Sequence, residues 1–193
     1  DKKIIASDEF SLGGSKWEID SPMDVYVLDG HLVFNKAKTS QKQPTAYAKN
    51  VAFDNAEFSF DLRLVRGSAF SAVFRKKDAS TYYQLNITTQ GRFTLQKRVL
   101  GAPLKTIAGG DGSISTNKAS NIHITLLGSS IKVHCDNALV IDAVDYSSLS
   151  GGIGFDGNDT LSYVDNVLVY KYAATDYNIE VVDPNAKPHA KLY

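Results

Sequence analysis

The sequence predicts an all-β protein, a two-sheet antiparallel β-sandwich of the jelly-roll class. Three observations support this fold class. Apolar residues recur with a period of two along most of the chain, turn-forming residues interrupt these runs at short intervals, and helical periodicity is hard to find. Many short strands with this punctuation are typical of a sandwich or barrel.

The clearest alternation lies in the middle of the chain, where Phe58, Phe60, Leu62 and Leu64 are separated by polar residues. Successive side chains of a strand point to opposite faces, so each such run has one apolar and one wetter face. The same pattern recurs in the runs that follow. We therefore expect the core between the sheets to contain Phe58, Phe60, Leu62, Phe74, Leu85, Ile87, Phe93, Leu95, Ile124, Ile131 and Val133.

The domain organisation follows from length and patterning. A chain of 193 residues is suited to one all-β domain, and we assign residues 1–172 to it and residues 173–193 to a C-terminal tail or linker. An alternative is that residues 177–182 form a strand that pairs with a neighbouring molecule. The single cysteine, Cys135, can form no internal disulfide and is in phase with apolar neighbours, so we expect it in the core.

Composition excludes two classes of partner. Lysine plus arginine equals aspartate plus glutamate at 21 each, which argues against nucleic-acid binding. No apolar run approaches the roughly 20 residues of a membrane-spanning helix, so we expect no membrane insertion. The start of the chain has no apolar signal segment, and we expect a secreted or cell-surface protein whose export signal has been removed.

The motifs of common enzymes are missing. None of the four histidines accompanies a nucleophile motif, and neither zinc-ligand spacing nor a phosphate-binding loop occurs; the glycines of residues 109–112 lack the flanking strand and helix. The paired carboxylates of glycoside hydrolysis, which sandwich glucanases carry as Glu-x-Asp-x-x-Glu, are also missing. The sequence therefore favours a non-catalytic protein, although an unrecognised sugar-processing site stays open as an alternative.

The wetter faces of the middle runs carry side chains suited to sugars. An aromatic ring can stack on the C–H patch of a sugar, while amide, guanidinium and carboxylate groups bind its hydroxyls. If the runs are neighbouring strands, these groups converge on one sheet surface. An ordinary polar surface and a protein-contact face remain alternatives. The predicted carbohydrate-binding residues are Asp61, Arg75, Tyr82, Gln84, Gln96 and Arg98.

Four segments resemble a known fold family. They are Ser7-Asp8-Glu9-Phe10 with Trp17 after it, Leu28-Asp29-Gly30-His31-Leu32-Val33-Phe34, Ser71-Ala72-Val73-Phe74-Arg75 with Tyr82-Tyr83-Gln84-Leu85, and Tyr163-Val164-Asp165-Asn166-Val167-Leu168-Val169. Over roughly residues 7–170 the chain resembles concanavalin A-like jelly rolls of the laminin-G and glucanase type. It is most similar to carbohydrate-binding modules of secreted enzymes that degrade fructans and other glycans. It also resembles a domain of 3-keto-disaccharide hydrolases, but departs from it at residues 68–70 and 82–84.

The resemblance implies binding of a polysaccharide or oligosaccharide, which would target a larger secreted protein to glycan. It also places Trp17 at the start of a core strand. Jelly rolls of this type often hold a structural calcium ion, and Asp8 and Asp165 occupy the matching motifs as its first-choice ligands; residues 156–159 offer a second acidic cluster or a simple turn. The alternative function is a structural or adhesive extracellular protein that assembles through its terminal strands.

Overall fold

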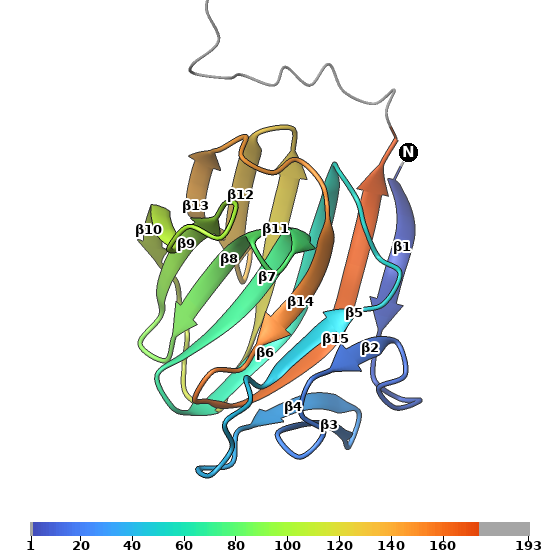
Figure 1. The fold of residues 1–193 in the computed structure, drawn as a ribbon. Helices are drawn as coiled ribbons and strands as arrows, with labels where there is room; N and C mark the ends of the chain where they lie inside the picture. The colour runs from blue at the N-terminus through green and yellow to red at the C-terminus, as the bar shows by residue number, and fades with distance from the viewer. Residues whose placement is uncertain (1, 174–193) are drawn as a thin grey trace, which may run out of the picture.

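The structure, a computed structural model, describes residues 2–173 and consists of two antiparallel sheets packed face to face (Figure 1). This confirms the predicted sandwich. No helix long and apolar enough to cross a membrane occurs in residues 2–173. The strand suggested for residues 177–182 lies outside the described residues.

The first sheet, sheet A, has eight strands, seven of them in one path and β1 paired to β15 off that path. In spatial order the path is β13 (Ala138–Val144), β12 (Ser130–Cys135), β11 (Ala119–Leu127), β6 (Ala56–Arg66), β15 (Leu161–Tyr172), β4 (His31–Asn35) and β3 (Val25–Leu28), and β1 spans Lys2–Asp8. The second sheet, sheet B, has seven strands. Its order is β10 (Lys105–Asp111), β9 (Arg92–Arg98), β8 (Thr81–Thr88), β7 (Ala69–Asp78), β14 (Gly152–Asp156), β5 (Thr45–Ala48) and β2 (Trp17–Ile19).

The core lies between the sheets and contains every side chain predicted for it, all of them buried. Its aromatic centre is Phe155 in β14, whose ring centroid lies 5.5 Å from that of Trp17 and 5.0 Å from that of Phe60. Trp17 is buried, as expected. Cys135 is also buried, and burial raises the pKa of its thiol, which fits a core hydrophobe rather than a reactive thiolate.

The two lateral edges of the sandwich differ. At one edge β10 of sheet B packs against β13 of sheet A. The close approach requires glycine, because a Cβ at Gly110 would fall on the carbonyl oxygen of Val140 in β13. A Cβ at Gly112 would fall on the ring of Phe93, which belongs to β9 of the same sheet B. The glycine cluster of residues 109–112 therefore serves packing. At the other edge β1 and β2 are farther apart, and a cavity of about 480 Å³ lies between them.

This packing makes a testable prediction at Gly110. Gly110→Ala should lower the free energy of unfolding by about 1–3 kcal/mol, because the new methyl group overlaps a backbone carbonyl that cannot rotate away. Urea denaturation followed by circular dichroism measures the change. The matched control is Gly14→Ala, whose new Cβ would meet only side-chain methyl groups, of Val27 at 3.3 Å and Ile19 at 3.6 Å. Equal stability of the two variants would contradict the assigned role.

Candidate functional site

A continuous row of side chains crosses the outer face of sheet B. The strand registers place Gln96 opposite Gln84, Gln84 opposite Val73, Val73 opposite Gly154, and Gly154 opposite Tyr47. A Cβ at Gly154 would fall on the ring of Tyr47, so the glycine lets this ring lie over β14. The row thus joins two amides on one side of the face to an aromatic ring on the other.

Two further rows flank this one. On one side Tyr82 lies opposite Arg98. On the other side Asn86 lies opposite Ser71, which lies opposite Asp156. We define the sheet B face by its larger side chains: Tyr47, Lys76, Tyr82, Gln84, Asn86, Gln96, Arg98 and Asp156.

Hydrogen bonds hold the amides of this face in place. Gln84 Nε2 donates to Gln96 Oε1 over 3.3 Å. Asn86 Nδ2 and Asn158 Nδ2 both donate to Ser71 Oγ, at 3.3 and 3.1 Å. Ser71 itself is buried although it points outward. These groups are fixed before any ligand arrives, which lowers the entropy lost on binding.

The aromatic and charged groups of the face lie beside each other. Lys76 Nζ lies 3.6 Å from the centroid of the Tyr47 ring, and burial lowers the pKa of this lysine. Burial, assisted by the negative charge of Asp156, raises the pKa of Tyr47 to about 12. Burial also raises the pKa of Asp156, whose Oδ1 accepts the backbone N–H of Asn158 at 2.9 Å. The arrangement offers a ring surface, amides, an ammonium group and a carboxylate to a polyhydroxylated ligand.

The structure brings together Tyr82, Gln84, Gln96 and Arg98 from the predicted set, on adjacent strands β8 and β9. Their role in binding stays a prediction. Sequence reasoning missed Tyr47, Lys76 and Asp156. Tyr47 lies within the short run of residues 45–48 and Asp156 ends the run of residues 152–156; the alternation of these short runs was the available signal.

The placement expected for Arg75 is wrong, because a β-bulge shifts the parity of β7. The four residues from Val73 to Lys76 lie opposite the three from Gly154 to Gly152, so β7 has one extra residue. Arg75 takes a left-handed backbone conformation with φ of 46° and is fully buried. Lys76 consequently faces outward in the place expected for Arg75.

The guanidinium group of Arg75 joins three loops at one end of the sandwich. Nη1 donates to the carbonyls of Gly128 at 2.7 Å and Ser148 at 3.4 Å, and Nη2 donates to that of Asp54 at 3.0 Å. Burial lowers the pKa of Arg75 to about 10, which leaves it charged at neutral pH. Its role is structural.

Arg75→Met should therefore lower the free energy of unfolding by at least about 3 kcal/mol, because several buried carbonyls lose their donors at about 1–3 kcal/mol each. Arg75→Lys should rescue little, since an ammonium group lacks the planar fork that reaches separate carbonyls. Arg92→Met is the matched control, because Arg92 is largely exposed and pairs with Asp111 at the surface. Thermal unfolding measures all three, and an Arg75→Met protein as stable as the control would contradict this role.

Asp61 is also misplaced by the prediction, because β6 belongs to sheet A and β7 to sheet B. Both oxygens of its carboxylate accept amide hydrogens, from Asn121 at 3.0 Å and Asn166 at 2.7 Å. It lines a hollow of about 80 Å³ on the outer face of sheet A. In that hollow the Arg63 guanidinium carbon lies 4.0 Å from the centroid of the Tyr163 ring. Asp61 is thus on the opposite side of the sandwich from Tyr82.

The expected pairing of Asp8 and Asp165 around one ion is wrong, because they occupy opposite faces of sheet A. Asp8 is on the core side, where its carboxylate accepts Trp17 Nε1–H at 2.9 Å and the Phe10 N–H at 2.8 Å. Asp165 is on the outer side, with Oδ2 3.9 Å from His31 Nε2. Among residues 2–173, no group of three or more His, Cys, Asp or Glu side chains could hold a metal ion. Calcium stays an untested prediction.

The second acidic cluster, residues 156–159, is a turn. The carboxylate of Asp159 accepts the hydroxyl of Ser68 at 2.6 Å and the backbone N–H groups of Ser68 and Ala69. These donors lower the pKa of Asp159. The carboxylate therefore fixes the loop that joins β6 and β7. Of the two expectations for residues 156–159, a calcium cluster and a simple turn, the structure shows the turn.

A buried polar cluster near Arg75 links β8 and β9 to the loop after β13. The hydroxyl of Tyr83 donates to Asp145 Oδ1 at 2.5 Å, and Lys97 Nζ donates to Asp145 Oδ2 at 2.6 Å. Burial alone raises the pKa of Asp145, but the hydrogen bonds from Lys97 and Tyr83 outweigh it and hold this pKa below its ordinary value. The ionised carboxylate is therefore the form that the fold stabilises.

Acid should weaken the fold through this cluster. Because the pKa of Asp145 is lowered on folding, its contribution is present above about pH 4 and is lost as the pH falls through the folded-state pKa. Asp145→Asn should cost about 1.5–3 kcal/mol at pH 7 and flatten the fall in stability below pH 4. Urea denaturation at several pH values tests this, with the exposed Asp142→Asn as control. An unchanged pH profile for Asp145→Asn would contradict it.

Comparisons with known proteins address the fold. No family model and no curated protein matches the sequence. Among solved structures, the carbohydrate-binding module CBM66 from Bacillus subtilis is similar with a TM-score of 0.62 and 21% identity, covering 79% of this chain and 93% of that one. A Bacillus licheniformis β-glucanase has a TM-score of 0.67 and 11% identity, with coverage of 87% and 98%. LamA from Zobellia galactanivorans, in complex with laminaritriose and laminaritetraose, has a TM-score of 0.64 and 14% identity, covering 88% of this chain and 99% of that one.

These likenesses show that the chain has the concanavalin A-like jelly-roll fold that its sequence motifs resemble. At such identities they show the fold alone. Function must be argued from the side chains of this chain.

Proposed function

We propose that this chain binds a polysaccharide or oligosaccharide without cleaving it, on the sheet B face, and directs a larger secreted or cell-surface protein to glycan. One observation carries the proposal. The face combines an outward aromatic ring at Tyr47 with a hydrogen-bonded amide pair at Gln84 and Gln96, along one row across adjacent strands.

The chemistry of this row suits a sugar better than a protein or an ion. The face presents small or polar groups, whereas the core of a protein–protein contact presents apolar ones. It carries an acidic side chain, Asp156, as well as a basic one, Lys76, so it does not favour an ion of one sign. A pyranose or furanose ring presents hydroxyls in its plane and C–H groups on its face. Amides can donate to and accept from paired hydroxyls, and Tyr82 offers a ring for stacking, while the ring of Tyr47 carries the ammonium group of Lys76.

The structural neighbours support the same ligand class. One is named a carbohydrate-binding module, and another holds two laminarin oligosaccharides. The alternative of assembly through terminal strands depends on residues 173–193, nearly all of which lie outside the described part of the chain.

Two tyrosines on opposite faces test the location. Tyr82→Ala should weaken binding about 3- to 10-fold, because an aromatic stacking contact contributes about 0.5–1.5 kcal/mol beyond its buried area. Tyr163→Ala, on the outer face of sheet A, should leave affinity within a factor of two. A glycan array with the parent protein identifies the ligand, and titration calorimetry then compares the variants.

The outcomes separate cleanly. Loss of binding in Tyr163→Ala alone would move the site to the hollow beside Asp61 and Arg63. Absence of binding to any glycan on a broad array, or the appearance of shortened products, would overturn the proposal. Retained thermal stability of both variants shows that the comparison concerns binding.

A further inference from the structure

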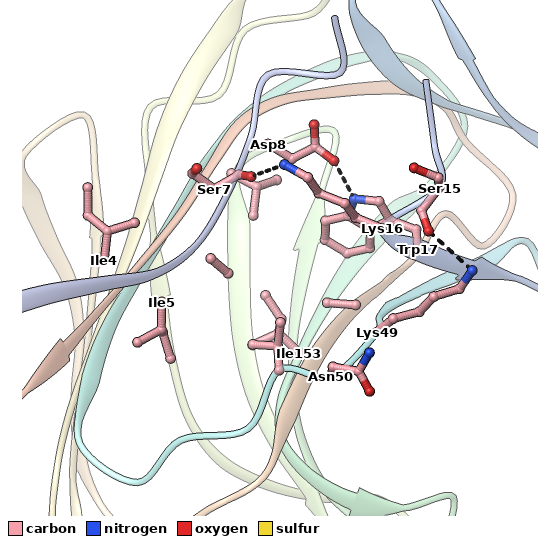
Figure 2. Close-up of a pocket in the computed structure, with 14 residues that line it drawn as sticks. Ile4, Ile5, Ser7, Asp8, Ser15, Lys16, Trp17, Lys49, Asn50 and Ile153 are labelled. Carbon is pink, nitrogen blue, oxygen red and sulfur yellow. Dashed lines mark hydrogen bonds between the residues drawn. The ribbon is translucent and has the colours of Figure 1, made fainter. Parts of the chain in front are cut away.

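A cavity lies at the open edge of the sandwich, away from the sheet B face. Its volume is about 480 Å³, within the usual range for small-molecule sites. Figure 2 shows it between β1 of sheet A and the strands β2 and β5 of sheet B. No strand of residues 2–173 closes this edge in the way that β13 closes the other against β10.

One part of the cavity, its floor, is apolar. The edges of three core side chains, Trp17, Ile153 and Val167, form this floor. Ile5 and Val51 pack beside them and are only partly buried. Such a surface gains roughly 25 cal/mol per Å² when an apolar ligand excludes water from it. The floor therefore suits the apolar part of a ligand, while the polar side chains of the lining lie nearer the mouth.

The rim of the cavity is basic. Lys16 Nζ donates to the carbonyl of Ser7 at 2.9 Å, and Lys49 Nζ donates to that of Ser15 at 3.2 Å (Figure 2). Among the ion pairs of the described residues, neither lysine has a carboxylate partner. Each bond holds an ammonium group at the mouth and leaves further N–H donors.

The lining contains one carboxylate, that of Asp8, which forms an ion pair with neither lysine and can balance at most one of their two charges. Both oxygens of Asp8 accept hydrogen bonds, from Trp17 Nε1 at 2.9 Å and from the Phe10 N–H at 2.8 Å. The mouth therefore retains positive charge above an apolar floor. This combination is complementary to a ligand with one anionic end and one apolar end.

We propose that the cavity binds an amphipathic anion of the fatty-acid class, with its hydrocarbon chain between β1 and β2 and its carboxylate at Lys16 and Lys49. The site is separate from the proposed carbohydrate face. Its ligand is recognised by burial of apolar surface together with charge-assisted hydrogen bonds at the rim.

Trp17 provides a direct reporter, because it is the only tryptophan in the chain and it lines the cavity. Decanoate, added below its micelle-forming concentration, should produce a saturable change in tryptophan emission and raise the melting temperature. Decanol should bind more weakly because it lacks the charge, and butyrate should not saturate the signal because it lacks the chain.

Variants separate the two halves of the site. The double variant K16Q/K49Q should weaken decanoate binding at least about 10-fold, since charged hydrogen bonds contribute about 1.5–3 kcal/mol each, and should leave decanol binding within a factor of two. Lys132→Gln, at the exposed position of β12, is a control that removes a lysine charge far from the cavity and should bind decanoate normally. Ala6→Phe should abolish binding of both probes by filling the cavity, with the melting temperature confirming that it folds.

Three results would overturn this inference. They are the absence of a saturable tryptophan signal with decanoate, equal decanoate affinity in K16Q/K49Q and the parent, and normal binding by Ala6→Phe. None of them bears on glycan binding at Tyr82, so this proposal and the proposed function fail independently.

Discussion

The buried guanidinium group of Arg75 is the interaction on which one end of the sandwich depends. It sits at the extra residue of β7, and its donors reach the loops that carry Gly128, Ser148 and Asp54. Two of these loops join strands of different sheets, so one side chain connects the two layers. The bulge also decides which side chains reach the outer surface. Because strand parity has a period of two, one inserted residue turns Arg75 inward and Lys76 outward, above the ring of Tyr47.

The sheet B face is organised around a small residue, Ser71, that is itself out of contact with water. Its hydroxyl accepts from the amides of Asn86 and Asn158, which are the first residues of the two Asn-x-Thr sequons at residues 86–88 and 158–160. The amides of Asn86 and Asn158, held in this way, lie next to Gln84 and Asp156 and restrict the space open to these side chains. The face therefore owes its geometry to polar contacts within itself. This is the condition under which a shallow site can bind a flexible sugar without ordering its own side chains first.

Much of the fold could be predicted from the sequence, because alternation reports burial directly: Phe58, Leu85 and Val133 are in the core as their parity requires. Tyr82, Gln84, Gln96 and Arg98 could be grouped for the same reason, since β8 and β9 are a simple hairpin pair. The failures occur where alternation carries no information. It does not reveal a bulge, so Arg75 was placed outside. Nor does it assign a strand to a sheet, so Asp61 was grouped with residues across the sandwich. For Asp8 and Asp165, motif likeness suggested nearness, but opposite orientations on paired strands separate their carboxylates.

The two edges of the sandwich show how backbone sterics determine where a cavity can exist. At the β10–β13 edge, Gly110 removes the side chain that would hold the sheets apart, and the layers meet. At the β1–β2 edge no such glycine contact draws the layers together, and Trp17 with its bond to Asp8 spans the space from the side of sheet B. Closure at one edge and separation at the other follow from a twisted pair of sheets that can be in full contact along only part of their width. A ligand that filled the open edge would replace water against core side chains such as Trp17, just as β13 keeps water from the core at the closed edge, so its binding would extend the hydrophobic core rather than add a separate one.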